Sequence, residues 1–196
     1  MERYEALIDG LVNENYAYQY DFFERALLLA LKDDLLELYE DGALNPAGIG
    51  KRFDYERNLK VRGDKILWLS KSNNAIQKEF LEEIEGFISY MNRTCYTNLN
   101  DYEFHYTVYK PGSFYRRHLD QFRSDRGRQF SLVTYLNEDW KTEDGGQITL
   151  YLDESKELEL LPNMGTSVIF KSDEVEHEVK QTNKHRLSIA GWLKSV

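Results

Sequence analysis

The sequence has 196 residues, of which 41% are hydrophobic and 30% are charged, a balance typical of a globular protein with one sizeable domain. The net charge of −9 and the lack of a dense basic run argue against a nucleic-acid partner. The single cysteine, Cys95, excludes an internal disulfide. The first five residues do not resemble a signal peptide, and the longest apolar run, Ala26 to Leu31, is too short to span a membrane. We therefore expect a cytoplasmic protein with no membrane partner.

Helical periodicity dominates the first 93 residues. Apolar residues recur at helical spacing from Asp21 to Tyr39, and Gly42 follows as a stop. Asp21 and Glu24 resemble a capping box at the start of this helix. A second helix is predicted from Ser72 to Met91. We interpret both apolar stripes as facing the core, in preference to a surface for a partner helix.

The segment between the two helices has the composition of an irregular surface loop. Asn45 to Asn58 contains Pro46, Gly48, Gly50 and charges of both signs. It leads into residues 61–69, whose second half has the pattern of a strand.

The remainder of the chain predicts one short strand after another. The expected strands are residues 102–110, 113–120, 128–137, 146–152, 157–161, 166–171, 175–181 and 186–193. Together with the preceding helices they predict an α+β fold: a double-stranded β-helix, which is a cupin-like jelly-roll barrel, backed by N-terminal helices. We expect a single domain over residues 1–196, with helical support in 1–93 and the jelly-roll core in 94–196.

Four residues in this β-rich half predict a metal site with a cosubstrate anchor. His118 and Asp120 form a His-x-Asp pair, His177 comes later, and Arg186 lies nine residues beyond it. Alternate residues of a strand share a face, so His118 and Asp120 can bind one metal. Two imidazoles and one carboxylate form the facial triad of non-haem Fe(II) oxygenases, which leaves positions for 2-oxoglutarate and O2.

Each of these residues also has an ordinary explanation. A His-x-Asp pair alone is usually a surface coincidence, and His177 lies in the charged stretch 173–178. Arg186 would then be a surface residue paired with one of those acids. The order and spacing of all four residues within the strand pattern favour the metal site.

Alternation along the strands also predicts the surroundings of Arg186. Arg186, Ser188, Ala190 and Trp192 share a face of the last strand, and a guanidinium suits a carboxylate. Tyr135, on another strand, could donate a hydrogen bond to the same carboxylate.

Several motifs together resemble the 2-oxoglutarate-dependent prolyl hydroxylases. The segments are Tyr109-Lys-Pro-Gly-Ser-Phe-Tyr-Arg-Arg-His-Leu-Asp120, then Thr134 to Trp140 followed by Gly145-Gly146, and finally His177 to Trp192. Upstream, Val61 to Ile66 with Trp68 is similar to a segment of the oxygen-sensing, hypoxia-inducible-factor type. The resemblance covers residue 61 to the C-terminus.

The resemblance implies a role for each matching residue and a set of cofactors: Fe(II), 2-oxoglutarate, O2 and, as a reductant, ascorbate. The implied iron ligands are His118, Asp120 and His177. Arg186 and Tyr135 would bind the distal carboxylate of 2-oxoglutarate. Tyr109 would also bind the cosubstrate, by lining its pocket. The other residues expected to line the pocket are Trp192, Val179 and Thr107.

The resemblance also implies a protein substrate. The loop before Arg62 would close over it, with Arg62, Asp64 and Arg128 helping to seat it. Bacterial single-domain relatives act on a prolyl residue of elongation factor Tu, which makes that protein the expected substrate. The chain departs from the sensor type at Gln121-Phe122-Arg123, where an Asn-Pro pair is common. This segment borders the substrate entrance, so the departure bears on substrate identity and not on iron.

Two alternatives remain. The same chemistry could act on a free amino acid or another small molecule, although the loop favours a macromolecule. The chain could also be a cupin-like module that binds a metal without turnover, because jelly rolls host many functions.

Overall fold

The computed structural model describes residues 2–48, 62–121 and 127–196. Its α-helices are α1 (Glu2–Glu14), α2 (Arg25–Glu40) and α3 (Ala75–Cys95). A short 3-10 helix, η1, covers Thr142–Asp144. None of the helices in these ranges is both long and apolar enough to cross a membrane.

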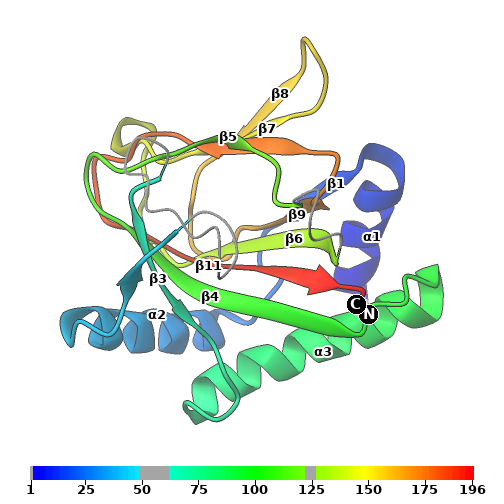
Figure 1. The fold of residues 1–196 in the computed structure, drawn as a ribbon, viewed down its shortest axis with the longest axis horizontal. Helices are drawn as coiled ribbons and strands as arrows, with labels where there is room; N and C mark the ends of the chain where they lie inside the picture. The colour runs from blue at the N-terminus through cyan, green and yellow to red at the C-terminus, as the bar shows by residue number, and fades with distance from the viewer. Residues whose placement is uncertain (1, 49–61, 122–126) are drawn as a thin grey trace.

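The strands form two antiparallel sheets within the described ranges. The larger sheet has the order β1 (Tyr16–Gln19), β9 (Ser167–Lys171), β6 (Arg128–Tyr135), β11 (Arg186–Lys194), β4 (Asp101–Tyr109), β3 (Asp64–Trp68) and β2 (Asn45–Pro46). The smaller sheet has the order β5 (Tyr115–His118), β10 (Glu176–Val179), β7 (Ile148–Tyr151) and β8 (Glu157–Leu160). Figure 1 shows the smaller sheet above the larger one, α2 and α3 on the opposite side of the larger sheet, and α1 beside β1 at one end of it. The predicted helix-backed jelly roll is therefore confirmed.

Two hydrophobic clusters account for this layering. The first lies between the helices and the larger sheet and includes Leu31, Phe80, Phe104 and Ile189. The second lies between the two sheets and includes Phe170. Because alternate residues of a strand face opposite ways, the strands of the larger sheet contribute to both clusters.

The two predicted helices exist with shifted ends. α3 begins after Asn74, whose side chain accepts a hydrogen bond from the Gln77 amide at 2.8 Å, as an N-cap should. The capping box at Asp21 and Glu24 was wrong: α2 begins at Arg25, and Glu24 makes no side-chain capping bond. Asp21 instead adopts a positive φ of 58° in the turn before the helix.

The first twenty residues hold two elements that the sequence pattern did not predict. α1 buries Leu7, Ile8 and Leu11 against the first cluster, and β1 pairs with β9. Three apolar positions are a weak periodic signal, and the pairing of β1 depends on a strand 150 residues later in the chain. Most of the predicted loop at 45–58 lies outside the described residues.

Candidate active site

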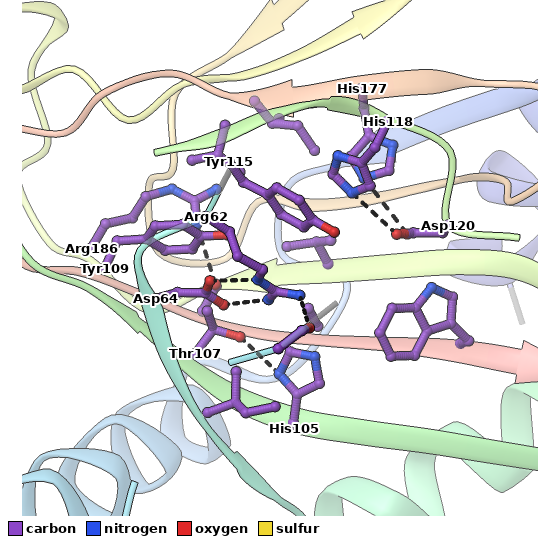
Figure 2. A pocket seen from close by; sticks show the side chains of 18 of the residues that line it. Arg62, Asp64, His105, Thr107, Tyr109, Tyr115, His118, Asp120, His177 and Arg186 are labelled. Atoms are coloured by element: carbon purple, nitrogen blue, oxygen red, sulfur yellow. Dashed lines mark hydrogen bonds and ion pairs between the residues drawn. The ribbon is translucent and has the colours of Figure 1, made fainter. Parts of the chain in front are cut away.

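A cavity of about 720 Å³ lies between the two sheets. Its walls come from β5, β7 and β10 on one side and from β3, β4, β6 and β11 on the other. Figure 2 shows the side chains that point into it. The cavity therefore collects residues that are far apart in the sequence.

The structure brings His118, Asp120 and His177 together at one side of this cavity. β5 and β10 pair directly, with His118 opposite His177, and the two imidazole centroids are 4.2 Å apart. Asp120 Oδ1 lies 3.3 Å from His118 Nε2, and its Oδ2 lies 3.6 Å from His177 Nε2. One ligand atom from each residue falls within 4.8 Å of the other two, which suits a shared metal ion.

The position of Asp120 is not set by alternation along a strand, contrary to the prediction from the sequence. β5 ends at His118, so Asp120 lies beyond the strand and alternation along it does not place the carboxylate. Asp120 is instead held by β6: the Ser131 hydroxyl donates to its Oδ2 at 2.7 Å, and Arg128 Nη1 donates to its carbonyl oxygen at 3.3 Å.

The donor set fits a divalent iron ion. Nδ1 of His118 lies 2.7 Å from the carbonyl oxygen of Arg116, and Nδ1 of His177 lies 3.4 Å from that of Val175. An Nδ1–H that donates to a carbonyl leaves Nε2 unprotonated and available to a metal. Two such imidazoles and a carboxylate are the ligands that non-haem Fe(II) prefers.

Charge states at this cluster also favour metal binding. Burial opposes ionisation of Asp120, yet the adjacent His177 and His118 and the Ser131 hydrogen bond hold the pKa of its carboxyl well below the ordinary value. Burial lowers the pKa of His177 to about 4, although Asp120 acts in the opposite direction. Near neutral pH the site therefore offers an ionised carboxylate and a neutral His177.

Arg186 is a buried cation in the same cavity. Its residue surface is 2% exposed, and its Nε donates to the Gly146 carbonyl at 2.7 Å. No carboxylate within the described ranges lies in ion-pair distance of its guanidinium. A buried charge requires compensation, so this guanidinium is suited to an anionic ligand.

Two tyrosines flank this guanidinium. The Cζ atom of Arg186 lies 5.1 Å from the ring centroid of Tyr109 and 4.9 Å from that of Tyr135. Burial raises the pKa of Tyr135 to about 12, so its hydroxyl keeps its proton near neutral pH. That buried hydroxyl has no hydrogen-bond partner of ordinary geometry in the described part of the chain. Tyr135 is not among the residues that line the cavity, and it contacts the site through the Arg186 guanidinium.

The other predicted lining residues also border the cavity. They are Thr107, Val179 and Trp192. Thr107 and Val179 are buried, and the Thr107 hydroxyl lies 2.9 Å from Nδ1 of His105.

The three residues predicted to seat a protein substrate form two ion pairs at the cavity. Arg62 and Asp64 make a two-point pair with N–O distances of 2.8 and 2.5 Å, and Asp64 is 2% exposed. Arg128 contacts Glu103 at 2.7 Å, and its Cζ atom lies 3.5 Å from the Trp192 ring centroid. The rest of the predicted closing loop lies outside the described residues.

Sequence reasoning overlooked several residues that line the cavity, among them His105 and Tyr115. His105 is 4% exposed and packs between Trp68 and Trp192, with ring centroids 5.0 and 5.6 Å away. Tyr115 stacks on His118 at 3.6 Å. His105 alternates with Thr107 and Tyr109 on β4, a signal that could have placed it at the site.

Comparisons with known proteins agree with this geometry. Residues 104–194 match the family model described as the 2OG-Fe(II) oxygenase superfamily. The crystal structure of a prolyl-4-hydroxylase from Pseudomonas putida is 34% identical, covers 98% of this chain and 99% of that one, and has a TM-score of 0.90.

Two animal proteins are more distant relatives. Egl nine homolog 1 of Rattus norvegicus is 25% identical over 183 residues, which cover 88% of this chain and 53% of that protein, so the chain spans about half its length. A prolyl hydroxylase from Trichoplax adhaerens, solved with a hypoxia inducible factor peptide, has a TM-score of 0.89 at 23% identity over 99% of this chain and 90% of that one. The similarity to the Trichoplax adhaerens structure supports the fold alone.

Proposed function

Because this chain belongs to the 2-oxoglutarate- and Fe(II)-dependent oxygenase superfamily, and within it to the prolyl 4-hydroxylase type, we propose that it hydroxylates a prolyl residue of a protein, with elongation factor Tu as the substrate. The observation that carries the proposal is the placement in one cavity of the His118, Asp120 and His177 cluster and of the Arg186 guanidinium, which has no carboxylate partner among the described residues. Such a pairing provides for a metal and for a dianionic cosubstrate at the same time.

The site residues would have different roles in this reaction. His118, Asp120 and His177 would hold Fe(II), which when bound supplies the activation of O2 that couples decarboxylation of 2-oxoglutarate to succinate and CO2 with hydroxylation of the prolyl C–H. Arg186 and Tyr135 would bind the distal carboxylate of 2-oxoglutarate by charge-assisted hydrogen bonds. That anchorage fixes the orientation of the cosubstrate relative to the metal ligands.

The side of the cavity near Trp192 would receive the substrate. Trp68, His105 and Trp192 form an aromatic wall there, and the Arg62–Asp64 and Arg128–Glu103 pairs lie beside it. An aromatic wall suits an apolar pyrrolidine ring and excludes water from it. The Pseudomonas putida relative, which matches nearly the whole chain, is itself described as a prolyl-4-hydroxylase.

The proposal also includes a reductant and a cellular location. We assign ascorbate the part of a reductant that restores Fe(II), and we place the enzyme in the cytoplasm, where elongation factor Tu would be accessible. The single cysteine of the sequence is compatible with a reducing compartment.

Peptide mass analysis tests the proposal. The protein is incubated with Fe(II), ascorbate, 2-oxoglutarate and purified elongation factor Tu, and succinate is measured in parallel. We expect a mass gain of one oxygen on a prolyl residue. His177→Ala should abolish both signals, whereas His185→Ala, at an exposed histidine outside the cavity, should retain both.

The outcomes separate the rival functions. Succinate without modified elongation factor Tu keeps the oxygenase and rejects this substrate, which would favour a different protein or a small molecule. Neither signal, despite demonstrated metal binding, would favour a module that binds a metal without turnover.

A further inference from the structure

Two buried serine hydroxyls lie in line behind the Asp120 carboxylate. The Ser131 hydroxyl on β6 lies 2.7 Å from Asp120 Oδ2 and 2.9 Å from the hydroxyl of Ser172, the residue after β9. Ser131 is 1% exposed and Ser172 is fully buried. Bulk water therefore does not reach either hydroxyl.

The direction of both hydrogen bonds follows from proton counting. An ionised carboxylate only accepts, so Ser131 must donate its single hydroxyl proton to Asp120 Oδ2. The bond between the two serines then has Ser172 as the donor and Ser131 as the acceptor. A chain of this direction polarises each hydroxyl toward the carboxylate and strengthens the bond to it.

The backbone around Ser172 supports the same arrangement. The Ser172 amide donates to the Gln129 carbonyl at 3.0 Å, and its carbonyl accepts from the Gln121 amide at 3.0 Å. Gln121 directly follows Asp120, so both the side chain of Asp120 and the chain beside it are attached to the same point of the larger sheet. This attachment matters because Asp120 lies beyond the end of β5 and lacks the support of strand pairing.

We infer that Ser131 is a positioning residue for the metal centre: its hydroxyl, oriented by Ser172, fixes the rotation of the Asp120 carboxylate so that Oδ1 remains available to the metal. The inference rests on the proposed role of Asp120 as a ligand. Groups that orient metal ligands by hydrogen bonds affect metal affinity although they do not touch the metal.

Metal affinity of the unliganded protein is the direct test. The probe is Mn(II) alone, and free Mn(II) is measured by electron paramagnetic resonance during titration of the full chain. Ser131→Ala should weaken Mn(II) binding by roughly 10- to 100-fold. Ser172→Ala should cause a smaller loss, because Ser131 keeps its own bond to Asp120. Ser131→Thr, which retains a hydroxyl on a strand that accepts a β-branched residue, should restore most of the affinity.

The same two strands supply a matched control. Thr134 on β6 and Ser167 on β9 form another buried hydroxyl pair with a 2.9 Å separation, and Thr134 points to the opposite face of the sheet from Ser131. Ser167→Ala should lower the resistance to urea in the presence of a chelator as much as Ser131→Ala does. Only Ser131→Ala should change Mn(II) affinity.

Each remaining result counts against a specific statement. If Ser131→Ala binds Mn(II) within about twofold of the unmodified protein, or Ser167→Ala loses as much affinity, the positioning role is overturned. Asp120→Ala distinguishes the failure of the underlying site: if it binds Mn(II) as tightly as the unmodified protein does, Asp120 is not a ligand. Should Ser131→Ala fail to fold, a Ser172→Ala variant with unchanged affinity would overturn the polarised chain on its own.

Discussion

At the scale of single residues, two of the buried ionisable groups, Arg186 and His105, differ in the charge that they carry. Arg186 carries a charge that the surrounding described residues do not neutralise, and His105 is a neutral imidazole between two indole rings. Burial of a charged or polar group costs free energy unless a partner compensates it. Each therefore predicts a measurable response.

Replacement of Arg186 should weaken 2-oxoglutarate binding. Arg186→Met keeps much of the side-chain volume but removes the charge-assisted hydrogen bonds to the distal carboxylate, a loss of roughly 1.5–3 kcal/mol, which is about tenfold or more in affinity. Calorimetric titration of the Mn(II)-loaded protein measures it. Arg25→Met, at an exposed guanidinium on α2, is the control and should bind normally. Equal affinities for the two variants would contradict the assigned role of Arg186.

His105 should make stability depend on pH below neutrality. Burial, with the positive charges of Arg62 and Arg128, lowers its pKa from 6.5 to about 4. Between these values the unfolded chain binds a proton that the folded protein excludes, so stability falls as the pH drops from 6.5 toward 4. The loss between pH 7 and pH 5 should be about 2 kcal/mol.

Urea unfolding of the metal-free protein at pH 7 and pH 5 measures this loss. His177 contributes in both proteins, so the comparison is between the unmodified chain and His105→Gln, which should lose about 2 kcal/mol less on acidification. Identical pH dependence in the two proteins would show that His105 titrates normally.

At the scale of elements, a polar contact joins α2 and α3 to the larger sheet. Asp34 on α2 accepts hydrogen bonds from Tyr106 of β4 at 2.8 Å, from Gln77 of α3 at 3.0 Å and from the Asn74 cap at 2.7 Å. Tyr106 and Gln77 are almost fully buried. This network fixes how the helices lie against the sheet, on the side away from the cavity.

Loss of the Asp34 carboxylate should destabilise the fold and spare the site. Asp34→Asn weakens charge-assisted bonds and presents amide protons to donors, at a cost of about 2 kcal/mol or more. Asp33→Asn, at the exposed neighbour on the same helix, should stay within about 0.5 kcal/mol of the unmodified protein. Chemical denaturation measures both, and Mn(II) affinity should be unchanged in each. A similar stability for the two variants would rule out a structural role for this contact.

At the scale of the whole molecule, the helical and β-rich parts of the chain share one sheet. β3, from the first part, pairs with β4 from Asp64 to Trp68, and β1 pairs with β9. The hydrophobic cluster under the larger sheet also draws on both parts. Residues 94–196 without the first part would expose that cluster, which is why we predict a single domain.

A single domain should unfold in one cooperative transition. Far-UV circular dichroism reports mainly on the helices, whereas fluorescence reports on Trp68, Trp140 and Trp192, which belong to the strands and the loops that join them. The two signals should give the same urea midpoint, and residues 94–196 expressed alone should not fold. Separate midpoints would divide the chain into two domains.

Local patterns in the sequence determined the jelly roll and its helical backing, and they singled out His118, Asp120, His177 and Arg186, which the structure places in one cavity. Prediction of the fold succeeded because strand alternation, helical periodicity and motif order are properties of neighbouring residues. It failed at α1 and β1, where the apolar signal is short and the strand pairing is distant.

Only the tertiary structure decided how these residues act together. Asp120 lies off its strand and is held by Ser131 and Arg128, His105 is buried between Trp68 and Trp192, and Arg186 has no carboxylate partner among the described residues. Each fact depends on contacts between segments that are separated by at least eight residues and often by many more. Burial and hydrogen bonding at such contacts depend on how the segments pack, and a periodic pattern along the chain contains no information about that packing.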